Sequence, residues 1–198
     1  MEHKDCIRQS VEAAHLLFMR NRTSGASANM SFLLGERMFV TASGTCFGNL
    51  KEDDFSEISL AGEHLAGRVP SKEWPAHLAM YRYCPGVQAV IHIHGRYGVL
   101  WSIMEHLDPN DCVPEHTPYL KMRVGRAGLV EYYTPGSREL FQALKERVLA
   151  CKSPAYLLKR HGALVGGTSV MDAFYNLEEL EESCALAWEL AVREARIG

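Results

Sequence analysis

The sequence has 198 residues, of which 47% are hydrophobic, and its formal net charge at pH 7 is −3. This size and composition suit a single domain with a full core, which we expect to span residues 1–198. No basic block marks a nucleic-acid-binding surface, and the apolar runs are far too short to cross a bilayer.

The six cysteines are scattered and form no C-x-x-C pair, which argues against a structural zinc ribbon or a thioredoxin motif. The first residues are polar and lack the apolar segment of a signal peptide. We therefore expect reduced, mostly buried thiols in a cytoplasmic protein, with neither nucleic acid nor membrane as a partner.

The N-terminal half predicts two helices and two hairpins. Apolar residues at helical spacing favour the first helix, and paired apolar runs around short turns favour the hairpins. The expected elements are a helix over 4–20, a hairpin from 32–34 and 38–40, a second hairpin from 58–60 and 63–65, and a helix from 70 to about 83. We expect Ser71 to cap this last helix and Glu73 to lie in its first turn.

The C-terminal half predicts further strands and helices, ending in a long helix with a glutamate-rich solvent face. The expected elements are a short buried strand carrying His92 and His94, a helix near 97–104, strands near 119–124 and 129–132, a helix over 137–149, strands over 156–159 and 163–166, and a helix over about 169–196. This mixture predicts an α/β (α+β) sandwich around a central sheet.

Two histidines, His92 and His94, interrupt the apolar run Ala89-Val90-Ile91-His92-Ile93-His94-Gly95. Residues two apart on a strand point to the same face, so both imidazoles can converge on one point. A buried strand gains nothing from paired imidazoles unless something binds them, and histidine is a common zinc ligand. The pair therefore indicates a metal site, with a pair of structural histidines as the alternative.

A catalytic zinc site needs a third protein ligand and an open position. His161 is the best candidate because it lies at an expected strand end, beside Gly162, which leaves room for close approach. A structural or surface histidine is the alternative. Glu73 is either an acid that complements the dipole at a helix start or a general base close to the metal.

The segment around Ser71 also has the features of a phosphate site. Free backbone N–H groups at a helix start, the Ser71 hydroxyl and the Lys72 ammonium all favour a bound anion. Asn29 and the Ser43-Gly44 turn can add further donors. Each signal is weak alone, and a solvated lysine at a helix start is the alternative for Lys72.

Together the motifs form a pattern that covers nearly the whole chain. They are Ala28-Asn29-Met30-Ser31, Thr41-Ala42-Ser43-Gly44, Pro70-Ser71-Lys72-Glu73, His92-Ile93-His94 and Arg160-His161-Gly162. In this order and at this spacing, the chain resembles the class II aldolase and adducin family. The resemblance implies a central, mainly antiparallel sheet flanked by helices.

The resemblance also implies roles for individual residues. His92, His94 and His161 would bind Zn2+ or another divalent metal such as Mn2+ or Co2+, and Glu73 would act as the acid/base while also reaching the metal. The implied phosphate-binding set is Ala28, Asn29, Ser43, Gly44, Ser71 and Lys72.

A narrower resemblance is to the branch of this family that decarboxylates 3-oxo-tetronate 4-phosphate. It rests on residues 45–50, 70–73, 117–119 with 122–123, 132–136 and 177–182. Fuculose-phosphate aldolases usually have serine where this chain has Lys72 and an aromatic residue where it has Pro135, and we expect their C-terminal tail to be missing here. Tyr119 and Arg123 lie in the branch motif and are expected to close the pocket, with strand packing and surface charge as their alternative roles.

The implied reaction is a metal-dependent conversion of 3-oxo-tetronate 4-phosphate to dihydroxyacetone phosphate and CO2 through an enediolate held on the metal. An L-fuculose-1-phosphate-type aldolase, giving dihydroxyacetone phosphate and an aldehyde, is the alternative, and a non-catalytic adducin-like binding module is the second. A 4-epimerase is less favoured because that branch has aspartate in place of Glu73. The resemblance further implies a homotetramer with sites between subunits, acting on a small phosphorylated sugar or sugar acid.

Overall fold

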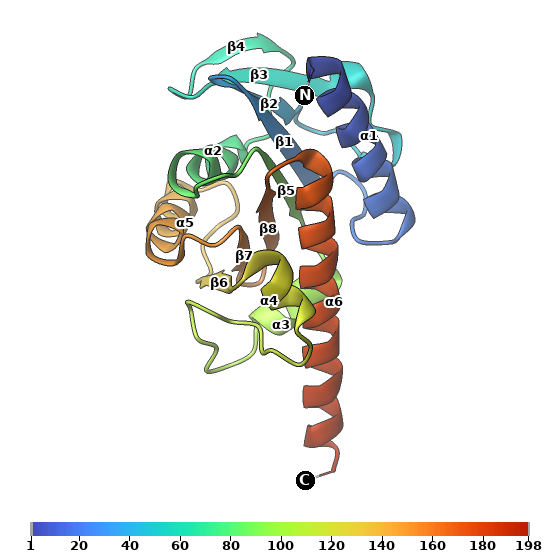
Figure 1. Cartoon of the computed structure of the whole chain (residues 1–198), viewed down its shortest axis with the longest axis vertical. Coiled ribbons are helices and arrows are strands. Elements are labelled where there is room, and N and C mark those ends of the chain that lie inside the picture. The colour runs from blue at the N-terminus through green and yellow to red at the C-terminus, as the bar shows by residue number, and fades with distance from the viewer. Residues whose placement is uncertain (1, 198) are drawn as a thin grey trace.

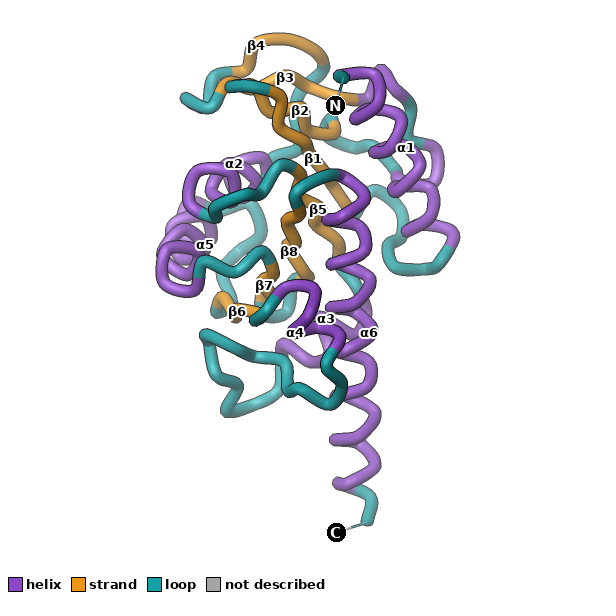
Figure 2. Tube along the Cα trace, in the orientation of Figure 1, coloured by secondary structure: helices purple, strands orange, loops and turns teal. Residues whose placement is uncertain are grey.

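An eight-stranded sheet organises the chain in the computed structural model, which describes residues 2–197 (Figures 1 and 2). The strand order is β4-β3-β2-β1-β5-β8-β7-β6. All neighbours pair antiparallel except β6 and β7, which pair parallel. The strands are β1 (Ala28–Leu34), β2 (Arg37–Thr41), β3 (Phe55–Ser59), β4 (His64–Gly67), β5 (Ala89–Ile93), β6 (Ala127–Val130), β7 (Ala155–Leu158) and β8 (Gly162–Gly167). The predicted mixed fold with a mainly antiparallel central sheet is therefore confirmed.

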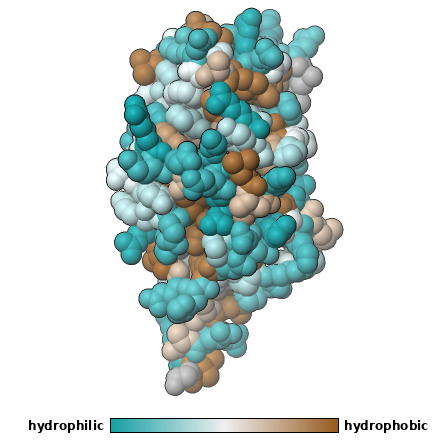
Figure 3. All heavy atoms as spheres, turned by 90° about the vertical axis from the view of Figure 1, so that its left-hand side faces the viewer, coloured by the Kyte–Doolittle hydropathy of each residue, from teal (hydrophilic) through white to brown (hydrophobic). Residues whose placement is uncertain are grey.

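Helices cover both faces of this sheet and complete three layers. They are α1 (His3–Met19), α2 (Trp74–Tyr83), α3 (Arg96–Ser102), α4 (Tyr119–Val124), α5 (Arg138–Cys151) and α6 (Val170–Ala195), with short 3-10 turns η1 (Phe47–Asn49) and η2 (Glu52–Asp54). Figure 1 shows α2 and α5 on one side and α1 and α6 on the other. The side that carries α2 and α5 is mainly hydrophilic on its surface, with smaller apolar areas between the polar side chains (Figure 3).

Alternation along the central strands decides which side chains reach the site. On β5, Ile91 and Ile93 join the core packed against α6, whereas Val90 joins the core packed against α2 and α5. His92 therefore projects to the α2 side. On the neighbouring β1, Ala28, Met30 and Phe32 belong to the α6-side core, so Asn29 and Ser31 also face α2. The sheet thus directs a row of polar residues toward one helix.

Residues 119–124 form helix α4, so the predicted strand there is wrong. Leu120 and Val124 are buried and the residues between them are exposed, which is the spacing of one helical face. Pro118 precedes the helix, and Gly125 ends it with a φ of 76°. These boundary residues outweigh the strand preference of the tyrosine and valine inside the segment.

Helix α2 begins at Trp74, so the prediction that Ser71 is its N-cap is wrong by two residues. Glu73 is the N-cap residue, yet its side chain makes no capping hydrogen bond. Pro75 lies in the first turn, where a missing N–H leaves no helical hydrogen bond unmade. The carboxylate of Glu73 is therefore free to contact side chains that project from the sheet.

The other predicted helices and strands are present with ends that differ by a few residues, and Ser137 and Ser169 are the hydrogen-bonded N-caps of α5 and α6. None of the helices formed by residues 2–197 is both long and apolar enough to cross a membrane.

Candidate active site

Four side chains meet beyond the end of β5: Glu73, His92, His94 and His161. One potential ligand atom from each lies within 4.8 Å of the others. The three imidazole centroids are separated by 4.8–5.1 Å. His94 is exposed whereas the other three residues are buried, so the cluster opens to solvent on the His94 side.

Three separate parts of the fold bring these residues together. His92 lies on β5 and His94 directly follows that strand. His161 lies in the turn between β7 and β8, where Arg160 has a φ of 58°, and β8 pairs with β5 along its length. Glu73 comes from the start of α2. The predicted convergence of the four residues is what the structure shows.

The imidazole of His92 is held in one tautomer. Its Nδ1 lies 2.9 Å from the Ala163 carbonyl oxygen, which can only accept, so Nδ1 donates there and Nε2 is the nitrogen that faces the cluster. A ligand histidine is commonly oriented in this way.

Several polar atoms of the cluster are close together without being satisfied. His92 Nε2 lies 3.0 Å from Glu73 Oε2, and His161 Nε2 lies 3.3 Å from Glu73 Oε1. Despite these distances, His92 Nε2, His161 Nε2 and Glu73 Oε1 are buried without a partner in hydrogen-bond geometry. An unsatisfied buried polar atom costs about 1–3 kcal/mol. One cation between them would satisfy all of these atoms, so the donor set fits a divalent metal.

The charge states also suit a metal. Burial opposes ionisation of Glu73, but the adjacent imidazoles of His161 and His92 outweigh it and hold the pKa of Glu73 below its usual value. Burial and the nearby His92 and His161 lower the pKa of His94 to about 4. An ionised carboxylate on Glu73 and a neutral imidazole on His94 are the forms of these two groups that can bind a metal.

A buried chain of hydrogen bonds connects Glu73 to the interior, and the sequence analysis missed its central residue, His77. His77 Nε2 contacts Asn29 Oδ1 at 2.5 Å, and His77 Nδ1 contacts Ser31 Oγ at 2.8 Å. Asn29 Nδ2 donates to Glu73 Oε2 at 3.4 Å, and Ser31 Oγ contacts the Tyr81 hydroxyl at 2.6 Å. Burial lowers the pKa of His77 to about 3, so its ring is neutral.

These contacts determine which atom donates in each hydrogen bond between Glu73 and Ser31. Asn29 Oδ1 can only accept, so His77 Nε2 carries the hydrogen and Nδ1 accepts from the Ser31 hydroxyl. The Asn29 amide nitrogen is thereby turned toward Glu73 and the site. The spacing of Glu73, His77 and Tyr81, four residues apart along one helical face, is the signal that would have revealed the chain.

The predicted phosphate-binding residues fall into two neighbouring groups. Ser43 N–H donates to the Val69 carbonyl at 2.8 Å and Ser71 N–H donates to the Thr41 carbonyl at 3.1 Å, so the Ser43-Gly44 turn lies beside Ser71. Ala28 and Asn29 begin β1, where they pair with Ile93 and His92 on the neighbouring strand β5. Lys72 is exposed and lies against Gly136.

Tyr119 and Arg123 lie elsewhere in the described part of the chain. Tyr119 is 58% exposed at the start of α4. Arg123 pairs with Asp172 at 3.1 Å and stacks over the Tyr175 ring, both on α6. Within residues 2–197 the structure does not bring either side chain into contact with the histidine cluster.

Gly162→Ala is expected to destabilise the protein and displace His161. A Cβ at position 162 would collide with the Ile93 carbonyl group and approach the His94 Cα to 3.1 Å, and this backbone cannot move without disturbing both strands. Overpacking of this kind costs about 1–3 kcal/mol, measurable by urea denaturation. Gly48→Ala is the matched control because the three atoms nearest its added methyl belong to the half-buried side chain of Phe18 rather than to backbone. An equal loss of stability in both variants would contradict a special requirement at Gly162.

Comparison with known proteins identifies the family of the chain. The profile of the Class II Aldolase and Adducin N-terminal domain matches residues 8–188. A protein of Escherichia coli O6:H1 named 3-oxo-tetronate 4-phosphate decarboxylase is 40% identical over 184 residues, covering 92% of this chain and 86% of its own. An L-fuculose phosphate aldolase of Methanococcus vannielii is 29% identical over 180 residues, covering 91% and 94% of the two chains.

A solved structure shows the same arrangement of elements. The crystal structure of YgbL from Klebsiella pneumoniae, described as an aldolase, epimerase or decarboxylase, superposes with a TM-score of 0.91 at 37% identity. The alignment covers 96% of this chain and 91% of that one. The sequence match over residues 8–188 and this superposition lead to one conclusion: the chain belongs to the class II aldolase and adducin family.

Proposed function

We propose that this protein is a divalent-metal-dependent lyase that decarboxylates 3-oxo-tetronate 4-phosphate to dihydroxyacetone phosphate and CO2. The observation that carries the proposal is the buried, unsatisfied cluster of Glu73, His92 and His161 beside the exposed His94. The 40% identity to a 3-oxo-tetronate 4-phosphate decarboxylase supports decarboxylation of this substrate over the other reactions of the family.

His92, His94 and His161 are the proposed metal ligands, with Glu73 close enough to join them. Three imidazoles and a carboxylate favour zinc, although Mn2+ or Co2+ also binds such donors. When bound, the metal supplies Lewis-acid stabilisation of the negative charge that develops on substrate oxygens. The exposed side of His94 is where substrate would reach the site.

Glu73 is the proposed proton donor. In 3-oxo-tetronate 4-phosphate the ketone is β to the carboxylate, so the bond between C2 and the carboxyl carbon breaks and its electron pair forms an enediolate over C2 and C3. Because Glu73 is a carboxylate in the free site, it takes up a proton from water once substrate is bound and then delivers that proton to C2, which completes dihydroxyacetone phosphate. Asn29, itself held by His77, orients the Glu73 carboxyl through its amide nitrogen.

The phosphate is proposed to bind Ala28, Asn29, Ser43, Gly44, Ser71 and Lys72. The pairing of the 41–43 and 69–71 segments supports this cradle because it sets a glycine turn beside a serine hydroxyl. Lys72 supplies the positive charge at the exposed rim. A small phosphorylated sugar acid is therefore the proposed substrate class.

The proposed assembly is a homotetramer in which Tyr119 and Arg123 close the pocket of a neighbouring subunit. The exposure of Tyr119 and the partial exposure of Arg123 on the same helix, α4, support this role. The six free thiols are typical of the reducing cytoplasm, which is where we place the reaction.

An L-fuculose-1-phosphate-type aldolase is the second candidate because relatives of that name share 29% identity with the chain. Both reactions use the same metal, acid/base and phosphate cradle and differ only in the group that departs. A non-catalytic adducin-like module is disfavoured because it has no use for Glu73 and three convergent histidines.

The co-product identifies the reaction. We expect metal-loaded protein to release CO2 and dihydroxyacetone phosphate in equal amounts from 3-oxo-tetronate 4-phosphate, since one bond cleavage produces both. A carbon dioxide assay coupled to quantification of the phosphorylated ketone measures this ratio. Lactaldehyde or glycolaldehyde from a ketose 1-phosphate, without CO2 from the oxo acid, would establish the aldolase instead. Purified protein that binds no divalent metal would contradict both enzymes.

A further inference from the structure

A cavity of about 630 Å³ opens beside the exposed histidine of the metal cluster. Three segments line it: the loop that follows α1, the junction between β5 and α3, and α6. Its charged and imidazole-bearing lining residues are Arg20, Arg22, His94, Arg96 and Glu181. His94 belongs to both the cavity and the histidine cluster, so the cavity adjoins the proposed metal site.

The cavity wall carries two arginines whose hydrogen-bond donors are not all paired within the described residues. Arg22 donates to Glu182 through Nη2 at 3.1 Å, but its Nε–H is buried without a hydrogen-bond partner. Arg96 is exposed and forms no ion pair within the described part of the chain. Buried guanidinium N–H groups are rarely left unpaired, so the Nε of Arg22 indicates a missing acceptor.

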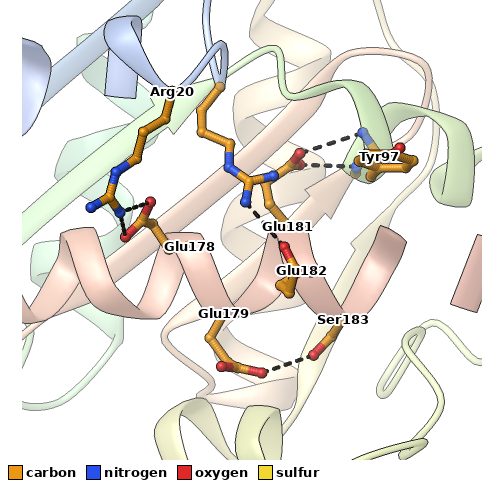
Figure 4. A network of polar contacts seen from close by, with 9 residues as sticks. Arg20, Tyr97, Glu178, Glu179, Glu181, Glu182 and Ser183 are labelled. Atoms are coloured by element: carbon orange, nitrogen blue, oxygen red, sulfur yellow. Dashed lines mark hydrogen bonds and ion pairs between the residues drawn. The ribbon is translucent and has the colours of Figure 1, made fainter. Parts of the chain in front are cut away.

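The nearby acidic residues do not fill that place. Glu181 is 1% exposed, and its carboxylate accepts hydrogen bonds from the Gly98 N–H at 2.9 Å and the Tyr97 N–H at 3.4 Å (Figure 4). Glu178 binds Arg20, and Glu182 lines a separate groove together with Arg20 and Arg22. Glu178 and Glu182 thus hold Arg20 and Arg22 from the α6 side, whereas Glu181, which also lines the cavity, is hydrogen-bonded to backbone N–H groups of α3 and forms no ion pair with Arg22 within residues 2–197.

We propose that this cavity binds the carboxylate of the substrate, with Arg22 and Arg96 as its specificity-determining residues. The inference rests on the proposed decarboxylase function. That substrate is anionic at both ends, and its phosphate occupies the cradle of Asn29, Ser43 and Ser71. The carboxylate end needs a second anion site next to the metal, whereas the aldehyde end of an aldolase substrate is neutral. Guanidinium groups bind carboxylates through paired N–H donors.

The chemistry predicts how this site divides its effect between binding and turnover. A cation beside the carboxylate stabilises the bound substrate through its negative charge. This stabilisation weakens in the transition state, because the charge moves out of the carboxyl group as CO2 forms. The ion pair between Glu182 and Arg22 weakens the attraction of Arg22 for the substrate carboxylate, and so limits the rise in the activation barrier. Loss of either arginine should therefore raise KM without lowering kcat.

The test compares ligands with and without a carboxylate on the metal-loaded protein. The acid probes are 4-phosphoerythronate and 4-phosphothreonate, which carry a hydroxyl in place of the 3-oxo group, and the control ligand is dihydroxyacetone phosphate. By calorimetry, Arg22→Gln and Arg96→Gln should each weaken the better-binding acid probe by about 10- to 100-fold, the worth of a charged hydrogen bond. Affinity for dihydroxyacetone phosphate should stay at the wild-type value.

Two further variants sharpen the comparison. Arg22→Lys keeps the charge but loses the planar fork, so it should recover only part of the acid affinity. Arg8→Gln removes an exposed arginine from α1 and should leave both ligands unaffected. Thermal unfolding and metal content verify that each variant is folded, and the exposed Arg96 provides the test if Arg22→Gln does not fold.

Equal weakening of both ligands would overturn the inference, because the cavity would then hold the phosphate. Unchanged binding of both ligands, or a fall in kcat at constant KM, would overturn it as well. Failure of the decarboxylase proposal looks different: the wild-type protein would release no CO2 from 3-oxo-tetronate 4-phosphate, whatever the arginine variants bind.

Discussion

Glu73→Gln is expected to retain its divalent metal and lose about 100- to 10,000-fold in kcat, the usual contribution of a positioned acid or base. The amide has nearly the same shape as the carboxyl group but cannot deliver a proton to C2. His92, His94 and His161 remain to bind the ion, and the His92 tautomer is fixed by Ala163 rather than by Glu73. Metal analysis of the purified variant beside steady-state kinetics measures both effects.

Glu12→Gln is the control for this substitution because Glu12 is exposed on α1. It makes the same chemical change at a distance from the cluster and should leave kcat unchanged. Turnover near the wild-type value in metal-loaded Glu73→Gln would remove Glu73 from proton transfer. Loss of both metal and turnover would instead make Glu73 primarily a ligand.

Local patterns predicted the parts of the site that lie on regular elements. The two-residue spacing of His92 and His94 on a strand is enough to predict their convergence. His161 beside Gly162 was predicted from its place at a strand end, and the structure supplies the reason for the glycine, which is the close passage of the Ile93 carbonyl. Side-chain periodicity and steric room are local properties, so a sequence can report them.

Properties that depend on distant contacts were not predictable in the same way. The segment 119–124 has residues that suit a strand, and the packing of Leu120 and Val124 against α6 adds to the effect of its boundary residues in favouring a helix. The arginine-lined cavity combines residues near 20, 96 and 181, which approach only once α1, α3 and α6 have packed together. No pattern within any one of these segments indicates an anion site.

The hydrogen-bond chain from Glu73 to Tyr81 is an intermediate case. Its helical half has a regular spacing that a reader of the sequence can find, but its partners Asn29 and Ser31 come from a strand more than forty residues earlier. A polar face on an otherwise buried helix is a recognisable anomaly. Its function as a support for the Asn29 amide becomes visible only when strand and helix are juxtaposed.

Removal of the metal with a chelator is expected to abolish turnover and to lower the melting temperature. An ion bound at the proposed site would satisfy buried atoms of Glu73, His92 and His161 that are otherwise unpaired in the folded protein. A ligand present at about 1,000 times its Kd stabilises a fold by about 4 kcal/mol. For a chain of this size, that free energy corresponds to roughly 10 °C in Tm. Adding back zinc, manganese or cobalt should restore both properties and identify the preferred ion.

His161→Ala and His116→Ala separate this metal effect from a general effect of the chelator. His161 belongs to the cluster, whereas His116 is exposed in the loop before α4. The His161 variant should lose most bound metal, most turnover and most of the difference in Tm between the metal-loaded and metal-free forms. The His116 variant should keep all three. If the chelator lowers Tm equally in wild type and His161→Ala, then the stabilising ion binds elsewhere, and the four convergent side chains are not its site.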